Sequence, residues 1–171
     1  MGREGSLQSN KAKKLSISSM AIALYVIIVY FTQGISFGAY QIRIATGLYA
    51  LAYEFPFLVL PLGLANMISN ILMGGMGLPD IVGGTIVGIV TSGSVVMLKK
   101  LPIVNGKLKS LICVLPIGIL PAVIVPLWLS VILKMKYVVL VMMLLPGQFI
   151  SAYTVGLLII NISGRIKRIL D

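Results

Sequence analysis

The residues that could do chemistry in this chain are few, and most of them are amides. The sequence has no His and one Cys, and its only carboxylates are Glu4, Glu54, Asp80 and Asp171. Two of these stand near the ends, which leaves Glu54 and Asp80 for chemistry within apolar segments. Hydrolysis, metal catalysis and proton relays need larger clusters of titratable groups. The sequence therefore favours ligand recognition over catalysis, and it predicts no catalytic residue, metal site or cofactor.

Polar side chains inside apolar segments are the candidates for ligand recognition. They are Gln41, Arg43, Asn66, Asn70, Asp80, Gln148 and Tyr153. Such groups are costly in a membrane interior and gather at binding sites or helix contacts. In the topology derived below, all of them approach the same, outer end of the bundle. That convergence favours capture of a small polar ligand over a continuous aqueous pore.

Each candidate also has a structural interpretation. Asp80 can cap the helix that begins beside it, or it can form an ion pair with Arg43. The two asparagines, four residues apart on one helix side, can simply join neighbouring helices. Glu54 is expected at a cytoplasmic turn, away from any ligand. Some aromatic residues can belong to the belt at the membrane surface, namely Phe37, Tyr40 and Trp128.

The composition indicates a membrane protein. Of 171 residues, 58% are hydrophobic and the mean hydropathy is +1.07, whereas soluble domains are roughly 45–50% apolar. The net charge of +10 does not indicate nucleic-acid binding, because the basic residues flank apolar runs and form no stripe with aromatics. Anionic lipid headgroups are the expected partners of such flanking charges.

The basic residues also predict a topology. If the chain crosses the bilayer six times, 11 of the 14 Lys and Arg lie on one side, and cytoplasmic loops carry such an excess. Both termini are therefore expected in the cytoplasm. The predicted fold is an all-α, six-helix transmembrane bundle. The eleven residues are Arg3, Lys11, Lys13, Lys14, Lys99, Lys100, Lys107, Lys109, Arg165, Lys167 and Arg168.

The chain divides into a cytoplasmic basic tail at 1–14, one membrane domain at 15–166 and a short cytoplasmic tail at 167–171. The predicted helices cover 15–33, 44–54, 57–73, 80–98, 109–133 and 138–164, with a structured outer loop at 34–45.

Prolines predict several irregularities in these helices. Pro56 sets a helix boundary, and the helix before it is too short to cross ~30 Å upright. Kinks are expected at Pro116, Pro121 and Pro126, and a bend or break at Pro146-Gly147.

Small residues mark one face of the first helix. Ser19 and Ala23 are four residues apart and Ser16 continues the face one turn earlier. This spacing lets helix backbones approach closely, either within the chain or as a docking face for a second membrane protein. A second group is expected to serve internal packing, namely Gly83, Gly84 and Gly88.

Two stretches resemble the QueT-type family. The run ISFGAYQIRIATGLYAL is similar to that family's FG-x-x-Q-x-R pattern, and LANMISNILMGGMGLPDIVGGTIVG to its A-N segment with a glycine-rich turn, an Asp and G-[ST]. Ser19-x-x-x-Ala23 is similar to its first-helix contact motif. The matching positions are Phe37, Gly38, Gln41, Arg43, Leu48, Ala65, Asn66, Gly74, Gly75, Gly77, Asp80, Gly84 and Thr85. The family's Ser-Glu after the Arg is replaced here by Ala45-Thr46.

The resemblance implies a substrate-binding S component of an energy-coupling-factor (ECF) transporter for queuosine precursors. It also implies the plasma membrane of a bacterium as the location, and a transmembrane coupling protein and two ATPases in trans as partners. The sequence has no Walker-type phosphate loop, which independently indicates that this chain does not itself hydrolyse ATP. A 7-deazapurine would meet Asp80 and an amide of Gln41, Asn66 or Asn70, with Phe37 or Tyr40 stacked on the ring.

Other functions remain open from the sequence. One is an S component for a different vitamin. A structural or pore-forming membrane protein predicts polar stripes along its helices, and a membrane-bound transferase predicts an acid/base or metal cluster; the sequence shows neither pattern.

Overall fold

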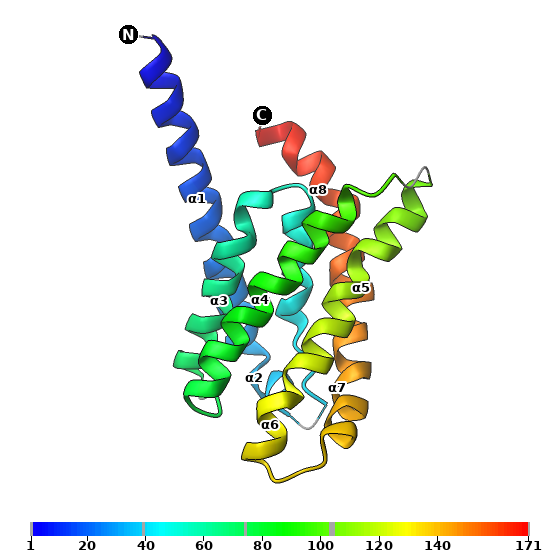
Figure 1. Ribbon diagram of the computed structural model, residues 1–171. Helices are drawn as coiled ribbons and strands as arrows, with labels where there is room; N and C mark the ends of the chain where they lie inside the picture. Colours follow the sequence, from blue (N-terminus) through cyan, green and yellow to red (C-terminus); the bar gives the residue numbers. More distant parts are fainter. Residues whose placement is uncertain (1, 39, 74, 103–104, 171) are drawn as a thin grey trace.

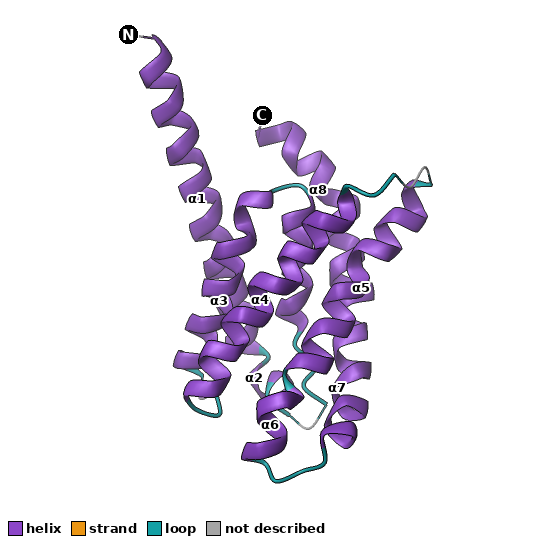
Figure 2. Cartoon of the chain, viewed as in Figure 1, coloured by secondary structure: helices purple, strands orange, loops and turns teal. Residues whose placement is uncertain are grey.

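Every regular element of the described chain is a helix, as the sequence predicts (Figures 1 and 2). The computed structural model describes residues 2–38, 40–73, 75–102 and 105–170. The elements are α1 (Gly2–Phe31), α2 (Gln33–Ser36), η1 (Ile44–Tyr53), η2 (Pro56–Leu58), α3 (Val59–Leu72), α4 (Leu78–Lys99), α5 (Gly106–Ile124), α6 (Pro126–Ile132), α7 (Tyr137–Ser151), η3 (Ala152–Gly156) and α8 (Leu157–Leu170).

Four helical segments in the described ranges are long and apolar enough to cross a membrane. They are Gln8–Phe31, Leu78–Lys99, Gly106–Ile132 and Tyr137–Gly164, and two shorter apolar helices cover Ile44–Tyr53 and Pro56–Leu72. The two chain ends lie at the same end of the bundle (Figure 1). We call this the terminal end. The opposite end carries α2, the α3–α4 turn and the α6–α7 loop.

The first predicted helix begins earlier than expected, and the second is a different type of helix. α1 begins at Gly2, so residues 2–14 of the predicted basic tail belong to the same helix as the first predicted span. η1 is a 3₁₀ helix of ten residues, which at about 2.0 Å per residue spans roughly 20 Å. Seven of its residues are buried. The short helix therefore lies inside the bundle, where its neighbours supply the packing that its weaker hydrogen-bond geometry lacks.

Of the five prolines singled out from the sequence, Pro56 begins η2, which confirms the predicted helix boundary. Pro116 and Pro121 lie inside α5, and Pro126 starts the separate helix α6, where a missing N–H costs little. At Pro146 the structure differs, because α7 runs through it without a break. The irregularity lies further on, at the π-helical turn η3.

Glycines let α3 and α4 approach closely, as the sequence predicts. A Cβ at Gly88 would lie 3.0 Å from the Cα of Gly63, and one at Gly83 would meet the Trp128 ring at 2.7 Å. α4 therefore packs closely against the α3 backbone at Gly88 and against the Trp128 ring of α6 at Gly83.

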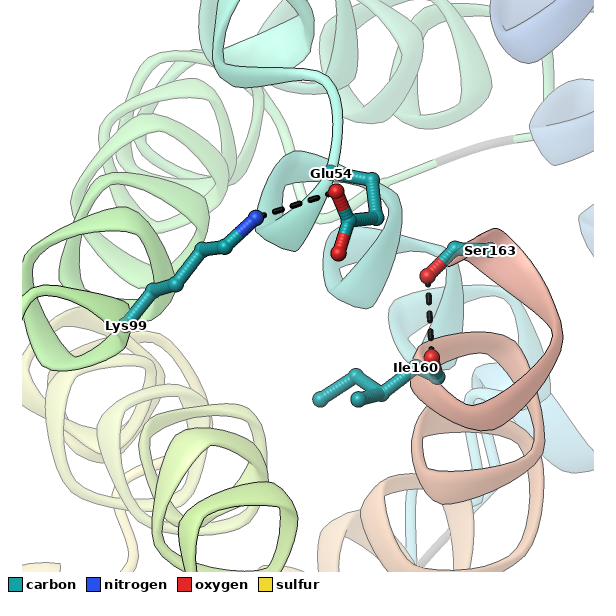
Figure 3. Close-up of polar contacts among 4 residues, drawn as sticks. All are labelled: Glu54, Lys99, Ile160 and Ser163. Carbon is teal, nitrogen blue, oxygen red and sulfur yellow. Dashed lines mark hydrogen bonds and ion pairs between the residues drawn. The ribbon is translucent and has the colours of Figure 1, made fainter. Parts of the chain in front are cut away.

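An ion pair ties the terminal end together. Lys99 Nζ lies 3.0 Å from Glu54 Oε2 (Figure 3) and 4.5 Å from the centre of the Tyr53 ring. Nearby on α8, Ser163 Oγ donates to the Ile160 carbonyl at 3.0 Å. Glu54 thus lies at the turn between η1 and η2, as predicted, and far from the polar cluster described next.

Gly147 offers a test of this packing. A Cβ at this position would collide with the Tyr40 carbonyl, so Gly147→Ala should destabilise the fold by about 1–3 kcal/mol through overpacking. Thermal unfolding in detergent measures this. Gly34→Ala is the control, because a Cβ there meets nothing within 4 Å. Equal melting temperatures for the two variants would contradict the packing described.

Candidate functional site

A cavity of about 260 Å³ lies at the end opposite the termini. α2 and the loop after it, the α3–α4 turn, α6 and α7 all contribute to its wall. It is lined by Phe37, Gly38, Gln41, Met76, Asp80, Leu129, Leu133, Met135, Leu140, Met143 and Leu144. The wall is mostly aliphatic, with one carboxylate and one side-chain amide, which is the usual composition of a small-molecule site.

Asp80 supplies the carboxylate. Gly77, with φ +87°, precedes α4 as its cap residue, and Asp80 follows in the first turn with 4% of its surface exposed. Its Oδ1 accepts from Trp128 Nε1 and its Oδ2 from the Met76 amide, each at 3.2 Å. A carboxylate can accept about four hydrogen bonds. Asp80 therefore closes the turn and retains acceptor capacity toward the cavity.

Asn70 separates Asp80 from Arg43. Its Oδ1 accepts from Arg43 Nη2 at 2.6 Å, and its Nδ2 donates to the Asp80 carbonyl at 2.8 Å. Within the described residues, no ion pair joins Arg43 and Asp80. The ion-pair interpretation is therefore wrong, and an amide bridge takes its place.

Aromatic rings surround the Arg43 guanidinium. Its central carbon lies 5.2 Å from the centre of the Phe37 ring and 6.0 Å from that of Tyr25. Arg43 is 5% exposed, and its Nε has no hydrogen-bond partner. Ring faces attract a cation, so Phe37 and Tyr25 stabilise a charge that no described carboxylate neutralises directly.

Gln41 supplies the second polar group of the cavity. It has a φ of +42°, a region few residues other than glycine adopt. Gln148 Nε2 donates to the Gln41 carbonyl at 3.0 Å, and Gln148 Oε1 accepts from Thr46 at 3.2 Å. The Gln41 Oε1 atom is buried and without a partner. Gln41 thus combines a positive φ, a place in the cavity wall and a buried acceptor without a partner.

Asn66 belongs to a second polar layer. Its Nδ2 donates to the Tyr49 hydroxyl at 3.0 Å and to the Gly84 carbonyl at 2.7 Å, and the Tyr49 and Tyr25 hydroxyls lie 3.2 Å apart. A cavity of about 10 Å³ borders this layer and shares Gln41 and Asp80 with the larger one. Its size corresponds to roughly one water molecule.

The structure separates the predicted site residues into three groups. Phe37, Gln41 and Asp80 line the larger cavity. Behind them are Arg43, Asn66, Asn70 and Gln148. Asn70 and Gln148 donate to the backbone carbonyls of Asp80 and Gln41, whereas Arg43 bonds to Asn70 and Asn66 to Tyr49 and Gly84. Tyr40 is 59% exposed and Tyr153 stacks on Phe149 at 5.7 Å, and neither lines the cavity.

Several contributors were not predicted. Trp128, assigned from sequence to the aromatic belt, donates to Asp80, and Thr46 and Tyr49 complete the polar network. The available signal was a lone Trp inside an apolar segment, since its N–H needs a partner when buried. The aliphatic wall from α6 and α7 carries no such signal.

The fold and this cavity define a helical membrane protein with a small-molecule site at one end of the bundle. Residues 15–165 match the family described as QueT transporter, so this chain belongs to that family, as its motifs predict. The family indicates transport of a small molecule. No curated protein and no solved structure matches the chain.

Asn70 should be needed for stability as well as for site geometry. Asn70→Leu leaves the Arg43 guanidinium buried without its amide acceptor, which should cost about 1.5–3 kcal/mol, the usual contribution of a hydrogen bond to a charged group. Unfolding of the purified protein in detergent measures the loss. Asn161→Leu makes the same change at an exposed position of α8 and should cost little. If both variants unfold alike, Asn70 does not hold the network together.

Proposed function

We propose that this chain is the substrate-binding S component of an ECF-type importer, and that it captures a queuosine precursor or a similar 7-deazapurine. The observation that carries the proposal is that two polar residues line one cavity, namely Asp80, a buried carboxylate, and Gln41, whose buried amide oxygen has no hydrogen-bond partner. Membership of the QueT transporter family supports it.

The proposal includes a six-crossing topology with both termini in the cytoplasm. In addition to the four long helices, η1 and the η2–α3 segment then serve as the second and third crossings. Chain ends at one end of the bundle agree with an even number of crossings. The excess of Lys and Arg at that end assigns it to the cytoplasm. The cavity would then face the outside, where a binding subunit meets its ligand.

The donors and acceptors of a guanine-like base suit this cavity. Such a base carries a ring N–H and an exocyclic amino group on one edge, and a carboxylate accepts both at once. Asp80 would take this edge, Gln41 would take a further N–H, and Phe37 would stack on the ring. Methionine and leucine side chains from the α6–α7 region would enclose the rest, and flexible Met135 and Met143 can adjust to ligand shape.

Trp128 provides the readout for the decisive experiment. It is the single Trp of the chain, and its N–H is bonded to the proposed ligand carboxylate. Titration of the purified protein with a 7-deazaguanine precursor should change its fluorescence and saturate. Asp80→Asn should weaken binding by at least about tenfold, since a hydrogen bond to a charged group contributes about 1.5–3 kcal/mol.

Two controls test whether the titration reports specific binding of the deazaguanine in the cavity. Tyr40→Phe, at an exposed residue outside the cavity, should leave the affinity unchanged. A common vitamin in place of the deazaguanine should give no saturating change. A vitamin that saturates would discard the 7-deazapurine while leaving an S component for another substrate. No ligand response from folded protein would overturn the binding function.

The first helix would supply the docking face for the coupling protein. Ser16, Ser19 and Ala23 are all exposed, whereas Ala21, Tyr25 and Val29 of α1 enter the core. The small residues therefore take little part in packing within the chain. We propose that they contact the transmembrane coupling protein, which assembles with two ATPase subunits.

Substitution on that face should separate docking from ligand binding. Ala23→Leu should abolish co-purification with the coupling protein because it blocks close helix approach, while the fluorescence titration stays unchanged. Thr154→Leu adds a similar side chain at an exposed position elsewhere and should co-purify normally. Retained assembly of Ala23→Leu would exclude this face.

A further inference from the structure

A second concave site lies between α4 and α5, near the terminal end and separate from the polar cavity. Its volume is about 440 Å³. The lining residues are Ser94, Met97, Leu98, Ile112, Leu115, Pro116, Ile119 and Leu120. The Ser94 hydroxyl already donates to the Val90 carbonyl at 2.8 Å, so the groove presents hydrocarbon almost throughout. Its occupant must therefore be apolar along this length.

The groove follows the length of α5. The α5 residues that line it, from Ile112 to Leu120, rise about 12 Å at 1.5 Å per residue. Met97 and Leu98, at the end of α4, form part of the facing wall. In a membrane-spanning bundle such an apolar groove is open to the bilayer, and an acyl chain is the apolar occupant that the bilayer itself supplies.

Unpaired lysines lie at the terminal end of the same groove. The α5 stripe continues from Ile112 to Lys109, three residues and one turn earlier, and Lys100 follows Leu98 just past the end of α4. Lys107 is exposed in the first turn of α5. None of Lys100, Lys107 and Lys109 forms an ion pair with a carboxylate of the described residues, whereas Lys99 pairs with Glu54. An apolar groove thus ends at a cluster of available positive charge.

We propose that this groove binds one anionic phospholipid, with an acyl chain between α4 and α5 and the headgroup phosphate on Lys100, Lys107 and Lys109. Basic clusters beside intramembrane grooves attract acidic headgroups, at about 1 kcal/mol for each Lys near the surface. The lipid would join the start of α5 to the end of α4. This site is independent of the ligand cavity and of the function proposed for it.

The test compares phosphatidylglycerol with phosphatidylcholine of identical acyl chains. Each lipid is added to the full-length protein in detergent, and bound lipid is counted by native mass spectrometry. One phosphatidylglycerol should be retained in preference to phosphatidylcholine. Replacing the lysines together, as K100Q/K107Q/K109Q, should weaken its binding by at least about tenfold.

Two further variants distinguish a specific lipid-binding site from nonspecific attraction of acidic lipid to positive charge. K11Q/K13Q/K14Q removes the same number of lysines from α1 and should leave binding unchanged. Ile119→Trp fills the groove from a half-exposed position and should abolish retention although all lysines remain. Equal retention of both lipids, equal loss in the two triple variants, or full binding by Ile119→Trp would each overturn the proposal.

Discussion

Arg43 is a buried cation that pairs with no carboxylate of the described residues, and the arrangement of the polar end depends on how that charge is held. Burying an unpaired charge is expensive, and direct contact with Asp80 would be the simplest remedy. The structure uses the amide of Asn70 and the faces of two aromatic rings instead. Because the guanidinium stays off the carboxylate, Asp80 keeps lone pairs that an ion pair would occupy.

Backbone geometry holds the other side of the cavity. Gln41 adopts a positive φ, and the Gln148 side chain donates a hydrogen bond to its carbonyl. Gly147 lies against the Tyr40 carbonyl. Strain of this kind persists only where surrounding contacts determine the conformation. Here α7 supplies those contacts, so the loop after α2 is fixed by a helix more than a hundred residues away in sequence. The cavity is consequently preformed on that side.

Local pattern predicted the helices, the turn before Asp80 and three residues of the cavity wall, because turn chemistry and polarity are readable along the chain. Pairings between distant segments were harder to predict. Trp128 meets Asp80 because Gly83 admits its ring against α4, and this depends on the packing of α6. Tyr40 was as strong a candidate from the sequence as Phe37, yet it is exposed and does not line the cavity. The type of η1 also escaped prediction, since tertiary packing decides between a 3₁₀ and an α-helix in so apolar a run.

The 3₁₀ form of η1 has a mechanical consequence. Ten residues at about 2.0 Å per residue are roughly 5 Å longer than the same ten in an α-helix. The segment is anchored near one tip through Thr46 and Gln148 and near the other through Glu54 and Lys99. An α-helical η1 would draw these two anchors toward each other by that length. The separation between the polar cluster and the terminal end of the bundle therefore depends on the helix type of η1.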